Sequence, residues 1–369
     1  MNRKEYISPW QLSCVTASFI LGTSLIYSGG TSYGGRDTWI SEIVSTILGV
    51  IIILMLSFLL SKFPGKSILE ILTALIGPFL GKLFLLYFIF FAILLAALIA
   101  FNIQNLFMAA IMTATPGWVF CLTLVLSIGY IIRKGLEPTV RSFEIVFPVV
   151  ILVLTAMFIV AAFQVDLTYI LPVFSVSWIS FLKSVIIVTS LPNAEIFLLA
   201  GIAIYVKDPR KILPGLLAGH LIAAFFLILR QFLATGIFSL AEAEQLVFPT
   251  YMVARTIHFG NFVERIEIFL IFTWFFVVFS KVAACIFVSL DSIRCLFKLP
   301  DIKPLVYPFC IFLIPLSLKG YGNYQETPAF ISQVLPLLDM TASFVVLPLL
   351  LFISILKSLS PSKKGRHKG

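Results

Sequence analysis

Two of the chain's apolar stretches of membrane length are broken in mid-span. The break is Gly22-Thr23-Ser24 in the first stretch along the chain and Leu191-Pro192-Asn193-Ala194-Glu195 in the sixth. Glycine and proline disfavour a continuous helix at such points. Unwound backbone at membrane depth is tolerated only where it is buried in protein or lines a cavity. Matching breaks in the two halves of a chain are typical of membrane folds built from inverted repeats, with a solute site between them. The pair of breaks therefore predicts a small-molecule site inside a bilayer.

The composition agrees with a membrane location. Of 369 residues, 60% are hydrophobic, 12% are charged and 37 are Phe, and the mean hydropathy is +1.09. A membrane helix needs about 20 mostly apolar residues. This length gives about ten spans, near 10–32, 38–61, 80–112, 117–133, 142–163, 178–206, 211–237, 262–296, 303–319 and 333–357. We therefore predict an all-α polytopic membrane protein.

The spans divide evenly around residue 170, and the break falls in the first member of each half. The division predicts a single transmembrane domain, 1–357, with one repeat at about 10–163, a second at about 178–319 and a last helix at 333–357. A basic tail, 358–369, follows. No cleavable signal is evident, because a polar turn rather than a cleavage site follows the first span.

The distribution of basic residues predicts the orientation. With the N-terminus in the cytoplasm, the loops and termini on the outside carry only Arg36, Arg255, Arg265 and Lys319. The other loop and tail bases then lie inside, as the positive-inside rule expects when both termini are cytoplasmic. The net charge of +9 thus indicates topology, and the dispersed bases do not form a nucleic-acid surface.

Several residue types argue against other functions. The five cysteines are scattered without C-x-x-C spacing, and the three histidines lie on different segments, so we expect no metal site. We find no nucleophile–base pair and no phosphate loop, so we expect neither an enzyme nor a bound cofactor.

Five short motifs occur in an order and spacing typical of one family. They are Gly22-Thr23-Ser24, Gly35-Arg36-Asp37-Thr38-Trp39-Ile40, Arg133-Lys134-Gly135-Leu136-Glu137, Phe248–Arg255 and Asn261–Glu267. Over nearly its whole length the chain resembles the membrane-embedded B subunit of bacterial spore germinant receptors. The resemblance implies a LeuT-like core of ten helices in a 5+5 inverted repeat, as in amino-acid permeases of the amino acid–polyamine–organocation superfamily. It also implies a small nutrient ligand, a membrane-anchored A subunit, a lipoprotein C subunit and the spore inner membrane.

The first break offers two interpretations. Unwinding at Gly22, Thr23 and Ser24 would free backbone N–H groups, and the following half-helix would direct its positive end toward a ligand carboxylate. A zwitterionic amino acid fits that end. Alternatively, Gly22 permits close helix packing, as small residues often do in membranes.

The second break adds an acid. Pro192 removes a backbone donor, Asn193 is expected to cap the following half-helix, and Glu195 falls in its first turn. Glu195 is a candidate to bind a ligand ammonium or a proton, and capping alone is the alternative. In the third span, Ala97 and Phe101 are candidate walls of a small apolar pocket, and ordinary packing explains them equally well.

Two bases lie within spans. Lys281 must be paired, neutral or hydrated there, and the resemblance implies that it occupies the space of a sodium ion and contacts carbonyls of the broken first span. Snorkelling toward the cytoplasmic surface is the alternative. Arg230 is expected to pair with an acid on the outer side, which the sequence does not identify.

Three functions remain open from the sequence. A receptor subunit would bind a nutrient between the breaks and pass a shift between two states to its partners. A proton-coupled amino-acid permease would use the same cavity with alternating access. An ion or water path opened by partners would use Glu195 and Lys281.

Overall fold

The computed structural model describes residues 6–26, 29–243, 246, 248–257, 266–319 and 329–359. The tail from residue 360 and most of the Asn261–Glu267 motif lie outside the described residues. Within the described ranges the chain is helical, and one isolated parallel bridge joins Ile7 to Val206. This bridge, with an Ile7 N–H to Tyr205 carbonyl distance of 3.0 Å, ties the start of the first span to the end of the sixth.

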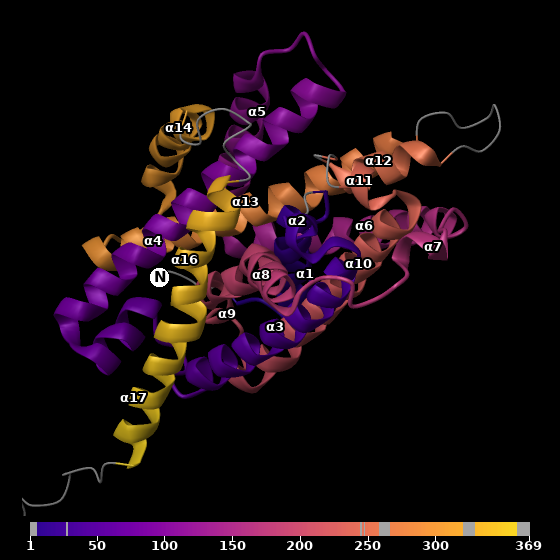
Figure 1. Ribbon diagram of the computed structural model, residues 1–369. Coiled ribbons are helices and arrows are strands. Elements are labelled where there is room, and N and C mark those ends of the chain that lie inside the picture. The colour runs from indigo at the N-terminus through magenta and orange to yellow at the C-terminus, as the bar shows by residue number, and fades with distance from the viewer. Residues whose placement is uncertain are drawn as a thin grey trace, which may run out of the picture.

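The first half of the chain contains five spans, whose order Figure 1 follows from indigo to magenta. The helices are α1 (Pro9–Ser24), α2 (Thr31–Gly34), η1 (Gly35–Asp37), α3 (Thr38–Ser61), α4 (Ile68–Ala110), α5 (Gly117–Ile132), α6 (Leu136–Ala162) and α7 (Leu167–Ile170). The segment α4 consists of two helices that meet at Gly77, and the first begins where Ser67 and Glu70 form a capping box. At Gly77 the backbone is not helical (φ 82°, ψ 169°), a conformation that favours glycine, and the helix after it corresponds to the predicted third span near 80–112.

The second half contains the other five spans. The helices are α8 (Trp178–Val188), η2 (Thr189–Asn193), η3 (Ala194–Leu199), α9 (Ala200–Ala203), η4 (Pro209–Lys211), α10 (Ile212–Ile237), α11 (Leu240–Ala243), α12 (Pro249–Thr256), α13 (Glu267–Phe297), α14 (Lys303–Lys319), η5 (Phe330–Val334), α16 (Leu335–Met340), η6 (Thr341–Val346) and α17 (Leu347–Leu359). Seven helical segments of the described residues are long and apolar enough to cross a membrane. The spans formed by α1, α5 and α14 are shorter, with 16 or 17 residues each.

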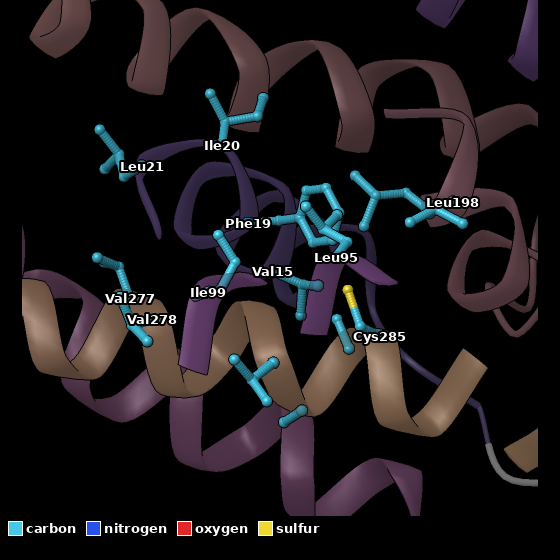
Figure 2. Close-up of a cluster of buried hydrophobic side chains, with 14 of the residues drawn as sticks. Val15, Phe19, Ile20, Leu21, Leu95, Ile99, Leu198, Val277, Val278 and Cys285 are labelled. Atoms are coloured by element: carbon cyan, nitrogen blue, oxygen red, sulfur yellow. The ribbon is translucent and has the colours of Figure 1, made fainter. Parts of the chain in front are cut away.

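Helix α1 lies at the centre of the bundle. Every residue from Gln11 to Ser24 is buried, as expected of a helix enclosed on all sides. It packs against α10, α13 and α6. Figure 2 shows its side chains Val15 and Phe19 close to Leu95 of α4 and Leu198 of η3. The end of the first span is therefore held inside protein, where irregular backbone is tolerated.

The last span packs against both halves. Helix α17 contacts α3 and α4, and α16 contacts η2 at the break of the sixth span. Figure 1 shows this yellow segment crossing α4. The boundaries of the two repeats stay predictions.

Candidate functional site

The two breaks meet inside the bundle. The sixth span leaves helical geometry at Leu191 (φ −115°, ψ 105°), where Pro192 removes a backbone donor. The Leu191 carbonyl accepts a hydrogen bond from the Ser24 hydroxyl, 3.2 Å away. Ser24 is the last residue of α1. A direct bond therefore joins the interrupted first and sixth spans.

The first break begins later than the sequence predicts. Gly22, Thr23 and Ser24 belong to the last turn of α1, and the Leu25 N–H still reaches the Leu21 carbonyl at 3.0 Å. The backbone N–H groups of Gly22–Ser24 therefore lie within the helix. The end of α1 presents carbonyls and the negative pole of the helix dipole, which favour a cation rather than a carboxylate.

A cation does lie at this helix end. Lys281 comes from the middle of α13, has no exposed surface, and donates hydrogen bonds to the Thr23 hydroxyl and the Glu195 carboxylate. Its Nζ also lies 4.5 Å from the centroid of the Phe19 ring, within the range of a cation–π contact. Lys281 therefore does not snorkel, and it contacts the first span through a hydroxyl rather than the expected carbonyl. Sequence reasoning missed Phe19, because an aromatic residue within an apolar helix gives no signal that it contacts a buried ammonium.

Glu195 stands where it was predicted, in the first turn after the break. It has no exposed surface, and its Oε2 pairs with Lys281. Its Oε1 has no hydrogen-bond partner among the described residues. Capping is thus not its principal contact. The Lys281 ammonium already provides the positive charge that a buried carboxylate requires.

The expected cap by Asn193 is wrong. Its side chain makes no capping bond. Instead Nδ2 donates to the Ser45 hydroxyl of α3 at 2.6 Å, and Ser45 donates in turn to the Val188 carbonyl at 3.2 Å. The loop of the break is therefore bonded to α3, because a polar amide buried in the bundle needs a partner.

The remaining predicted site residues lie in different parts of the buried core. Gly22 lies against α13, where an added Cβ would come within 2.8 Å of the Val277 carbonyl oxygen. This is the close packing that the sequence also allowed. Pro192 is buried at the break. Ala97 and Phe101 are buried on α4, which packs against α13. The structure thus brings Thr23, Glu195 and Lys281 together, and places Ala97 and Phe101 in the surrounding core.

An ion pair and a small cavity lie beside the breaks. Arg230 of α10 and Glu42 of α3 are both buried and lie 3.0 Å apart, which identifies the acid that the sequence left open. The cavity has a volume of about 10 Å³, roughly one water molecule. It is lined by Ser24, Gly29, Glu42, Ile187, Val188, Leu191, Arg230 and Ile331. The bonded breaks therefore border a small cavity with both polar and apolar lining residues.

Sequence reasoning missed one acid of this region. Asp339 of α16 has no exposed surface, and its Oδ2 accepts a hydrogen bond of 2.6 Å from Ser190 beside the break. An acid inside a predicted span was the available signal. Among the residues that the structure describes, no three His, Cys, Asp or Glu side chains are grouped to hold a metal ion.

The sequence matches the family described as spore germination protein over residues 6–323. This chain belongs to that family. Spore germination protein KB of Bacillus subtilis (strain 168) is 24% identical over 354 residues, which are 95% of this chain and 94% of the relative. Spore germination protein YndE of the same organism is 24% identical over 284 residues, 76% of each chain.

Solved transporters share the fold of this spore germination family member. MhsT, solved in complex with L-phenylalanine, has a TM-score of 0.67 and 14% identity, and the match covers 97% of this chain and 100% of MhsT. A Na⁺-coupled sialic acid symporter has a TM-score of 0.63 and 13% identity, covering 92% and 79%. The fold is thus LeuT-like, with broken first and sixth helices as predicted. The chain is thus an integral, multi-pass membrane protein of the spore germination family.

Proposed function

We propose that this protein is the nutrient-sensing membrane subunit of a spore germinant receptor. The observation that carries the proposal is the bond between Ser24 and the Leu191 carbonyl, which joins the two breaks beside a small cavity. A nutrient that binds there must separate or rearrange these groups. Binding energy can then shift the fold between two states, provided that the nutrient binds one state more tightly.

The ligand we propose is a small nutrient, with amino acids as the first class to test. Two buried ion pairs beside the breaks offer groups for both ends of such a molecule. Arg230 and Glu42 line the small cavity, and Lys281 lies with Glu195 outside its lining. The residues proposed to bind or enclose the nutrient are Gly22, Thr23, Ser24, Ala97, Phe101, Pro192, Asn193 and Glu195. Lys281 is proposed as the cation substitute that couples the first span to the sixth.

The setting proposed is the inner membrane of the spore, with both termini in the cytoplasm and A and C subunits as partners. Family membership and the bias of basic residues toward one side support this proposal. In this setting, the rearrangement at the breaks would reach the partners through the outer surface of the bundle.

A proton-coupled amino-acid permease is the second candidate. One observation favours it: an ammonium, Lys281, holds the end of α1 and the Glu195 carboxylate together. A fixed side-chain cation at this position removes the need for a bound metal cation. A transporter of this kind would move its solute without a spore partner.

The test uses spores in which this receptor, with its A and C subunits, is the sole germinant receptor. Loss of refractility is measured across single amino acids, sugars and nucleosides, in parent spores and in spores carrying Ser24→Ala. We expect a response to one nutrient class and a shifted dose response in the variant. A response that persists after deletion of this subunit alone would overturn the receptor role. Uptake of the same nutrient by proteoliposomes containing only this chain, driven by a proton gradient, would favour the permease.

A further inference from the structure

The last span is attached to the sixth on both sides of the break. On one side the Ser190 hydroxyl donates to Asp339 Oδ2 at 2.6 Å. On the other the Ser343 hydroxyl donates to the Ala194 carbonyl. These two bonds bracket Leu191 and Pro192, so movement of the break and movement of the last span are linked.

Asp339 faces few groups that can balance its charge. Glu195 of η3 and Lys281 of α13 lie close enough to act on it electrostatically. A further titratable neighbour among the described residues is Tyr87 of α4, whose hydroxyl donates to the Leu338 carbonyl at 2.6 Å. The elements η2, η5 and η6, which also pack against α16, present the hydroxyl of Ser190 and no charged side chain.

The cluster therefore contains two carboxyl groups and one ammonium. Lys281 is bonded to Glu195, which leaves Asp339 without a bonded cation. Two carboxyl oxygens in the cluster, Glu195 Oε1 and Asp339 Oδ1, are buried and have no hydrogen-bond partner among the described residues. An unbalanced charge in such a place is costly, and a group so placed takes up a proton instead.

We propose that Glu195, Lys281 and Asp339 form a proton-binding site, which holds one proton on Asp339 while the last span is docked on the break. The proton makes the cluster neutral: one ammonium balances one carboxylate, and the second carboxyl is uncharged. Loss of that proton leaves one net negative charge in the contact between α16 and the break. The docked arrangement is weakened, so proton release and separation of the last span occur together.

The number of protonated carboxyl groups tests this inference directly. Full-length protein in lipid nanodiscs is examined by infrared spectroscopy, in which a protonated, dry carboxyl group gives its own C=O stretching band. At neutral pH we expect one such carboxyl in the parent protein and none in Asp339→Asn. Lys281→Met removes the ammonium, so the number of protonated carboxyl groups should rise to two. The double variant Lys281→Met/Asp339→Asn should return that number to one.

Asp291→Asn is the matched control, because Asp291 lies on α13 but pairs with Arg294 at 2.6 Å near the end of the helix. Its spectrum should keep the parent band. The inference is overturned if the parent lacks the band, or if Asp339→Asn retains it. Exchange of Na⁺ for choline tests whether Na⁺ rather than a proton occupies the site. A band that appears only without Na⁺ would mean that a metal cation, and not a proton, neutralises Asp339. None of these measurements requires a nutrient, so they are independent of the proposed receptor role.

Discussion

The Lys281 ammonium of α13 is bonded to the Glu195 carboxylate directly after the break of the sixth span, and neither side chain is exposed. The same ammonium holds Thr23 at the end of α1. Three spans therefore depend on one buried charge. Their relative positions cannot change without new partners for that charge, because an isolated ion inside protein is costly.

Removal of this ammonium should destabilise the protein. We expect Lys281→Met to lower the free energy of unfolding by roughly 3–5 kcal/mol, the usual cost of removing one partner of a buried pair. The double variant Lys281→Met/Glu195→Gln should recover part of the loss. Thermal unfolding in nanodiscs provides the measurement.

The exposed pair formed by Glu137 and Arg141 of α6, 3.1 Å apart, is the matched control. Water screens this pair, so Arg141→Met should change stability by less than about 0.5 kcal/mol. Equal effects of the two substitutions would contradict the assigned role of the buried pair.

A side chain at Gly22 should push α1 away from α13. In Gly22→Ala the added Cβ would lie 2.8 Å from the Val277 carbonyl oxygen, a backbone atom that cannot turn aside. We expect a loss of about 1–3 kcal/mol of stability from overpacking, together with a weaker nutrient response. The control is Gly117→Ala, where the nearest atom is Met108 Sδ, at 2.7 Å. That flexible side chain can move, so the control variant should respond normally.

Loss of the Ser45 hydroxyl should loosen the second break. In Ser45→Ala the buried amide of Asn193 loses its acceptor, which should cost about 1–3 kcal/mol. The nutrient dose response should shift, since Asn193 lies within the break. Ser61→Ala removes an exposed hydroxyl of the same helix and should stay within about 0.5 kcal/mol of the parent. An unaltered melting temperature in Ser45→Ala would refute the role of this bond.

The loop after α10 carries a pH-dependent helix cap. Hydrogen bonds from the Ser239 hydroxyl and N–H lower the pKa of Glu242, which lies in the first turn of the short helix α11 (Leu240–Ala243). A carboxyl group whose pKa is lowered by folding stabilises the folded protein at pH values above its unfolded pKa. This stabilisation is lost as the pH falls through the folded pKa. Ser239→Ala should therefore raise the pKa of Glu242 toward its ordinary value, as measured by carboxyl NMR. The pKa of Asp166, which Thr168 lowers, should not change.

Much of the fold follows from local properties that can be read along the chain. Apolar runs give the spans, and the peptide before Pro192 is a point where a helix cannot continue. The third span begins after Gly77, close to its predicted start, and the Ser67–Glu70 capping box begins a separate short helix before it. The first break was placed too early because Gly22 serves helix packing, and the helix continues to Ser24.

Side-chain partners were harder to predict. Asn193 was expected to cap its own helix, but its amide reaches Ser45, 148 residues away in sequence. Asp339 and Ser190 are separated by 149 residues, and their contact depends on how the last span crosses the sixth. Such pairs leave no mark in the local pattern of either helix.

The sequence by itself determined that the chain spans a membrane about ten times, that two spans are broken, and that acids and a lysine lie at membrane depth. Only the tertiary structure decided that Lys281 joins Thr23 to Glu195, and that Asp339 completes the cluster. The physical reason is the burial of the central helices. Periodicity identifies the inward face of a helix only when the other face differs from it. Helix α1 is buried on all sides, so its contacts are fixed by packing angles and distances between helices.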